Sequence, residues 1–164
     1  MNKQTRQLFN MVLTGGVTFS ALSIAQTIPK QADFDVTYEA VGSVVRSIDA
    51  GDGQAVNLYQ ATLLFTNPSN TPLLRNISAN CIESAFTAAG DSGYCVFTDK
   101  DGDKFVEVIT RPAGQKVGTG TFGAGTGKFK GISGKVNWEP IQQLAADKGT
   151  FNFIGRKTGS YQLP

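Results

Sequence analysis

Short stretches in which apolar and polar residues alternate, separated by clusters of glycine and proline, constrain the fold of this chain more than any other feature. From Phe34 to Ala40 every second residue is apolar, and the residues between them are Asp, Thr and Glu. A period of two is typical of a strand with one buried face. The pattern recurs about eight times between turn-forming residues, and no long helical pattern interrupts it. The sequence therefore predicts an all-β fold.

Such a chain has to cover the edges of its sheet. Closing the sheet on itself removes both edges, and about eight strands make a small barrel whose interior holds side chains or one ligand. We therefore predict a single eight-stranded antiparallel barrel over residues 33–164, with a two-layer sandwich as the alternative. Within it we expect a turn at residues 90–93 and one or two helical turns over residues 140–147, with Pro140 at the first helical position.

The N-terminal segment has the pattern of an export signal. Lys3 and Arg6 lie in a polar start, residues 8–25 carry no charge, and small residues precede Gln26. This order predicts a signal peptide over residues 1–25 with cleavage before Gln26. A transmembrane anchor is the alternative, because the uncharged stretch is close to the length of a span. Export would make the mature protein secreted or periplasmic, without a membrane span.

Charge and residue types narrow the classes of function. The chain has 15 basic and 13 acidic residues, and Lys3 and Arg6 are two of the basic ones, so the part after residue 25 carries no net charge. That balance gives no electrostatic reason for a nucleic-acid partner, and we expect none. The sequence contains no histidine, which excludes Ser-His-Asp and Cys-His catalysis. We predict no metal and no cofactor.

Two cysteines, Cys81 and Cys95, both follow the predicted signal peptide. In an oxidising compartment an isolated pair is most economically a disulfide, and two buried free thiols are the alternative. Direct opposition on neighbouring strands would need a turn centred on Ala88. The turn expected at residues 90–93 does not fit this, so we expect the bridge to span a wider loop or a bulge.

Two further motifs suggest ligands but match them incompletely. Residues 118–123 have the glycine spacing of a dinucleotide-binding loop, yet a strand pattern and not a helix follows, so a sharp bend of the sheet explains the glycines better. Asp99, Asp101 and Asp103 resemble half of a calcium loop, but Thr110 stands where the closing glutamate belongs. We interpret this segment as a hairpin turn.

Carboxylates within strands are the remaining candidates for chemistry. Glu39, Glu83 and Glu107 each lie in a strand pattern. If one of them faced an apolar cavity, burial would raise its pKa into a range useful for proton transfer. A solvent-facing strand residue is the alternative for each. We take Glu39 as the candidate catalytic residue, and Tyr38, Glu83 and Glu107 as candidate ligand-binding residues.

Two segments of the chain also resemble those of a known family. Residues 119–138, TGTFGAGTGKFKGISGKVNW, resemble the glycine-rich segment of the allene oxide cyclase barrel group, and dirigent proteins carry a related segment; residues 126–134 account for most of the match. Residues 93–103 resemble small exported bacterial members with no assigned activity. The resemblance implies an eight-stranded antiparallel barrel with an apolar cavity, which is often oligomeric in the plant members. It also implies a catalytic role for Glu39, because Tyr38-Glu39 resembles the Tyr-Glu pair of the cyclases, although Val41 stands where those enzymes have an asparagine.

Three functions follow from these observations. The first is an exported barrel that binds a small apolar ligand or a protein partner. The second is an isomerase or cyclase that acts on a lipid-like substrate through a buried carboxylate. The third is a structural or assembly protein, functional through its surface and forming a homo-oligomer.

Overall fold

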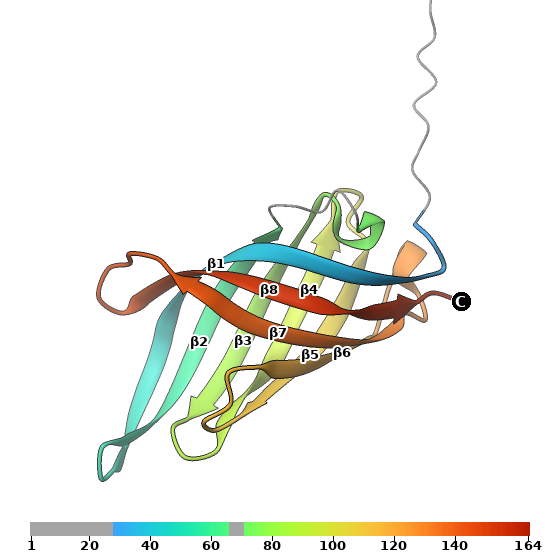
Figure 1. Ribbon diagram of the computed structural model, residues 1–164. Coiled ribbons are helices and arrows are strands. Elements are labelled where there is room, and N and C mark those ends of the chain that lie inside the picture. The colour runs from blue at the N-terminus through green and yellow to red at the C-terminus, as the bar shows by residue number, and fades with distance from the viewer. Residues whose placement is uncertain (1–27, 66–70) are drawn as a thin grey trace, which may run out of the picture.

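A computed structural model describes residues 28–65 and 71–164 of the chain and confirms the predicted architecture. Eight antiparallel strands follow one another around a closed barrel, and the last pairs with the first (Figure 1). The strands are β1 (Gln31–Gly51), β2 (Gln54–Phe65), β3 (Ile77–Phe86), β4 (Gly90–Asp99), β5 (Lys104–Pro112), β6 (Gly118–Gly123), β7 (Ser133–Gln143) and β8 (Thr150–Gln162). The predicted signal peptide, residues 1–25, lies outside the described residues. Within the described ranges, no helix is long and apolar enough to cross a membrane.

One end of the barrel, called here the closed end, is filled by aromatic side chains. Phe97 stacks on Phe105 with ring centres 4.5 Å apart, and Phe105 also meets Phe122 at 5.0 Å and Phe129 at 5.1 Å. Phe129 comes from a single 3₁₀ turn, Gly127–Phe129, that lies between β6 and β7. Contacts of this kind exclude water and stabilise the barrel beyond simple burial.

At the other end, called here the open end, the β1–β2 and β7–β8 hairpins extend past their neighbours (Figure 1). The extension of β7 contradicts the expected helical turns over residues 140–147. Pro140 lies in the strand opposite Gly155, and the register shifts between Pro140 and Gln142. A bulge of this kind lets a strand tolerate a proline, because the ladder is already interrupted there.

The disulfide between Cys81 and Cys95 is present, as predicted. Its setting is simpler than expected, because the two cysteines are directly opposed in the β3–β4 ladder. The turn covers residues 87–89, and Gly90, with φ of 102°, already begins β4. The prediction of a turn at residues 90–93 was therefore wrong.

Candidate functional site

A cavity of about 400 Å³ occupies the open end of the barrel. It exists because small side chains face inward at this end. At the closed end, phenylalanine side chains fill the interior instead. Ala40, Ala61 and Ala85 line the cavity from β1, β2 and β3, and the disulfide lies between β3 and β4. The interior is thus packed over one part of its length and hollow over the other.

Aromatic rings form much of the cavity wall. Tyr59 meets Phe151 at 5.9 Å between ring centres, and Phe153 lies 6.1 Å from both Phe151 and Tyr38. Trp138 completes the set from β7. A wall of this composition favours a ligand with a flat or aromatic apolar part.

Two of these rings pack closely against a glycine on the neighbouring strand. Tyr38 is directly opposite Gly155, and Trp138 is directly opposite Gly118. A Cβ at either glycine would overlap the ring that lies over it. These glycines therefore fix the positions of Tyr38 and Trp138 against the wall, which leaves the space in front of the rings free.

A buried ion pair lies beside the cavity. The Lys157 ammonium donates to both carboxylate oxygens of Glu107 at 2.7 Å, and the two side chains are 3% and 0% exposed. Lys157 also lies 5.7 Å from the centre of the Tyr38 ring. A buried charge is tolerated only when it is paired and hydrogen-bonded. The pair satisfies that requirement, so each of these charges is neutralised by the other.

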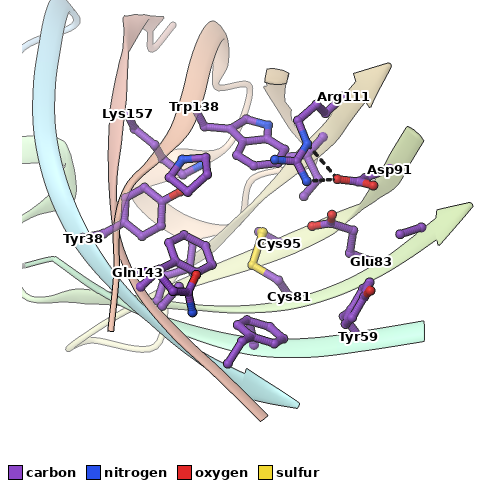
Figure 2. Close-up of a pocket in the computed structure, with 18 residues that line it drawn as sticks. Tyr38, Tyr59, Cys81, Glu83, Asp91, Cys95, Arg111, Trp138, Gln143 and Lys157 are labelled. Atoms are coloured by element: carbon purple, nitrogen blue, oxygen red, sulfur yellow. Dashed lines mark hydrogen bonds and ion pairs between the residues drawn. A yellow bond between two sulfur atoms is a disulfide. The ribbon is translucent and has the colours of Figure 1, made fainter. Parts of the chain in front are cut away.

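A second ion pair lies on the wall itself. Arg111 and Asp91 are directly opposed on β5 and β4, and Arg111 donates Nε–H to Asp91 Oδ2 at 2.8 Å, with Nη2 contacting the same oxygen. The guanidinium also lies over the Trp138 ring, 4.9 Å from its centre. Figure 2 shows this pair at the upper edge of the cavity. The cation–π contact and the ion pair together hold Arg111 in place.

Glu83 projects from β3 into the cavity, next to the disulfide and close to the Arg111–Asp91 pair (Figure 2). Burial raises the pKa of this carboxyl to about 7, and the negative charge of Asp91 adds to the shift, while Arg111 and Lys157 oppose it. A carboxyl group with such a pKa exchanges its proton near neutral pH. Glu83 can therefore act as an acid, a base or a titratable ligand contact.

The two cavity tyrosines stay protonated at neutral pH. Burial raises the pKa of Tyr38 and of Tyr59, and in both cases the charge of Glu83 contributes to the rise. Each phenol therefore keeps an O–H group, and that of Tyr59 already shares a side-chain hydrogen bond with Asn57.

The residues singled out in the sequence occupy different places. Tyr38 and Glu83 line the cavity. Glu107 is fully buried beside it and holds Lys157. Glu39 is half-buried between the inward-facing Tyr38 and Ala40, is not a lining residue, and its suggested catalytic role stays a prediction.

Sequence reasoning missed Asp91, Arg111, Trp138 and Lys157 as site residues. For Arg111 a signal was present, because it has the same strand parity as the buried Phe105 and Ile109. Residues of one parity face one side of a sheet, so Arg111 had to point inward.

The aspartates that resemble half of a calcium loop surround a lysine. The Lys128 ammonium lies 2.6 Å from Asp101 Oδ2 and 3.8 Å from Asp103 Oδ2, and it also contacts Asp99. Asp99 Oδ1 accepts hydrogen bonds from the backbone N–H groups of Asp101 and Asp103, which shapes the hairpin turn. In the described part of the chain, no group of three or more His, Cys, Asp or Glu side chains is placed to hold a metal ion.

Comparison with known proteins gives one informative result. No protein-family profile matches the chain, and no curated protein matches it. Among solved structures it is similar to the pterocarpan synthase dirigent protein GePTS1, with 13% identity, a TM-score of 0.50, and coverage of 82% of this chain and 93% of that one. At this identity the likeness shows the fold alone. It agrees with the resemblance to dirigent barrels, whereas the allene oxide cyclase grouping and a bacterial origin stay predictions.

Proposed function

We propose that this barrel binds a small, largely aromatic ligand in the cavity at its open end. The observation that carries the proposal is the combination of a hollow of about 400 Å³ with a wall of five aromatic residues. Ligand sites of proteins typically have volumes of about 300–1,000 Å³, an apolar lining and a few polar groups that fix orientation. Glu83, Asp91 and Arg111 form a polar cluster on one side of the cavity, and Lys157 and Gln143 lie on the other (Figure 2).

The fold comparison supports this proposal by analogy only. The structural neighbour is a pterocarpan synthase dirigent protein, and the two chains share a fold at 13% identity. Function depends on the residues of a site and not on the fold that carries it. The proposal therefore rests on the cavity of this chain.

The only tryptophan of the chain, Trp138, lines the cavity and provides the assay. Titration with naphthol, a neutral aromatic probe, should change its fluorescence with a saturable dependence on concentration. Ala61→Phe fills the cavity and should weaken binding by at least about tenfold. Ala50→Phe adds the same ring at an exposed position of β1 and should leave binding unchanged. Equal binding by both variants, or no response of the wild-type protein, would refute the proposal.

A second candidate function is proton transfer to or from a bound substrate by Glu83, which would make the protein an isomerase or cyclase. The observation that favours it is a carboxyl group inside an apolar cavity with a pKa of about 7. Nitrobenzisoxazole tests it, because a carboxylate base removes the C–H proton while the N–O bond breaks, giving a nitrile and a coloured phenolate.

The two glutamates make a matched comparison in this assay. Glu83→Gln should abolish the protein-dependent rate, and Glu39→Gln should leave it unchanged, because Glu39 does not line the cavity. The wild-type rate should rise with pH through about 7. If only Glu39→Gln abolished the rate, the catalytic role suggested by the family resemblance would be supported and the assignment to Glu83 would be wrong.

Export and self-association complete the proposal. The Cys81–Cys95 disulfide is consistent with an oxidising compartment, as a secreted or periplasmic protein requires. Ile82, Tyr94 and Val108 are directly opposed across three strands and are exposed on the outer face, which supports contact between copies. Sedimentation velocity at several concentrations tests this, and a monomer at all of them would contradict a homo-oligomer.

A further inference from the structure

We propose that the preferred ligand of the cavity is an aromatic organic cation, a small amine or a quaternary ammonium compound, whose charge is neutralised by Glu83. This inference rests on the proposed ligand-binding function and specifies the chemical class of the ligand. It follows from the charges around the cavity and from the faces of the rings that line it.

The charges at the cavity do not balance. Three carboxylates, Glu83, Asp91 and Glu107, meet two cations, Arg111 and Lys157. Each cation already has a carboxylate of its own, since Arg111 pairs with Asp91 and Lys157 pairs with Glu107. Within the described residues no lysine or arginine forms a salt bridge with Glu83. Glu83 is thus the carboxyl group without a salt bridge, and it lines the open space next to Asp91, with which it shares a side-chain hydrogen bond.

The aromatic rings of the cavity also fall into two groups, those with a cation contact and those without. The Trp138 ring already carries Arg111, and the Tyr38 ring already lies near the Lys157 ammonium. Tyr59, Phe151 and Phe153 line the cavity without such a contact among the described residues. Aromatic faces attract a cation within about 6 Å, by about 0.5–2 kcal/mol depending on desolvation. A positively charged ligand head near Glu83 would therefore find a carboxylate and, beside it, the Tyr59 ring, which has no cation contact among the described residues.

An anionic ligand fits this site less well. Its natural partners, Arg111 and Lys157, are already held by carboxylates, and Glu83 and Asp91 would repel it. A neutral aromatic ligand would gain the ring contacts but would leave Glu83 without a counter-charge. The preferred order is therefore cation, then neutral compound, then anion.

Three probes of similar size test this order by Trp138 fluorescence: benzyltrimethylammonium, the neutral naphthol and phenylacetate. At a pH of about 8, above the pKa of Glu83, the cation should bind at least about tenfold more tightly than the anion. Glu83→Gln should reduce this preference to about twofold or less. Asp33→Asn removes an exposed carboxylate of β1 that does not line the cavity and should retain the preference.

The pH dependence is a second readout. The titratable and charged groups that face Glu83 are Tyr38 on β1, Tyr59 on β2, Asp91 on β4, Arg111 on β5 and Lys157 on β8. Burial raises the pKa of the Glu83 carboxyl to about 7. Affinity for benzyltrimethylammonium should therefore fall as the pH drops below 7, whereas affinity for naphthol should change little.

The outcomes separate the two proposals. If none of the three probes binds to the wild-type protein, the ligand-binding function itself fails. If naphthol binds but phenylacetate binds as tightly as the cation, or more tightly, only the inference about charge is overturned. A charge preference that persists in Glu83→Gln would also overturn it.

Discussion

Replacing Glu83 with glutamine should make the protein more stable at neutral and alkaline pH. Burial raises the pKa of this carboxyl from 4.5 to about 7 in the folded protein. Between these two values the folded state holds a proton that the unfolded state has released. Stability therefore falls as the pH rises through this window, and it is lowest above 7, where the buried group is ionised.

The size of the effect follows from the shift. One pKa unit corresponds to about 1.4 kcal/mol, so the raised pKa of Glu83 costs the wild-type protein about 3 kcal/mol at a pH above 7 relative to a pH below 4.5. Glutamine has a similar shape and does not titrate, so Glu83→Gln removes this dependence. The quantity to compare is the difference in the free energy of unfolding between the variant and the wild type, because the contributions of other titrating groups largely cancel in this difference.

Equilibrium unfolding in urea, followed by Trp138 fluorescence at a series of pH values from about 4 to 8, measures this difference. As the pH rises across that range, the free energy of unfolding of Glu83→Gln should increase by about 3 kcal/mol relative to that of the wild-type protein. Glu39→Gln is the matched control and should run parallel to the wild type. If the curves of Glu83→Gln and the wild type were parallel too, the raised pKa of this carboxyl would be wrong.

Three further predictions concern the buried ion pair, the glycine that packs against it, and the disulfide. Glu107→Gln leaves Lys157 buried without a counter-charge and should lower the free energy of unfolding by about 3–5 kcal/mol, and the double variant Glu107→Leu with Lys157→Met should recover most of this loss in urea unfolding. Gly120→Ala places a Cβ against the Glu107 carboxylate and should lower the thermal midpoint by the equivalent of about 1–3 kcal/mol; an unchanged midpoint would mean that the ion pair shifts freely. Replacing both Cys81 and Cys95 with serine should cost about 3 kcal/mol, measured by urea unfolding against the oxidised wild type, because the bridge closes a loop with a sequence separation of 14.

The barrel itself could be predicted from the sequence. The period of two is visible within each short segment, and the need to cover sheet edges favours closure of the strands into a barrel. The turn before β4 could not be predicted, because glycine occurs both in turns that need a positive φ and in strands that approach each other closely. Gly90 lies at a positive φ and follows the turn, whereas Gly93 lies within the strand. A Cβ at Gly93 would overlap the backbone around Glu83, so this glycine serves a close approach between strands. Turn composition alone does not separate these uses.

The site was predictable only as far as strand parity extends. Parity places Glu83 with Cys81 on the inner face, and Glu107 with Phe105 and Ile109. It does not say which inward-facing cation meets which carboxylate. Lys157 reaches Glu107 from a strand 50 residues further along the chain, and that contact depends on how the sheet closes.

The pairing of β1 with β8 makes the final strand a requirement for every other part of the molecule. Gln31 lies opposite Gln162, so the first and last strands meet across nearly the whole described chain. A chain that ends before Thr150 has seven strands and two uncovered edges, and these edges attract other chains. It also lacks Phe151, Phe153 and Lys157, and with them one wall of the hollow. Shortening the polypeptide at its carboxyl end should therefore give aggregates, and not a smaller folded barrel.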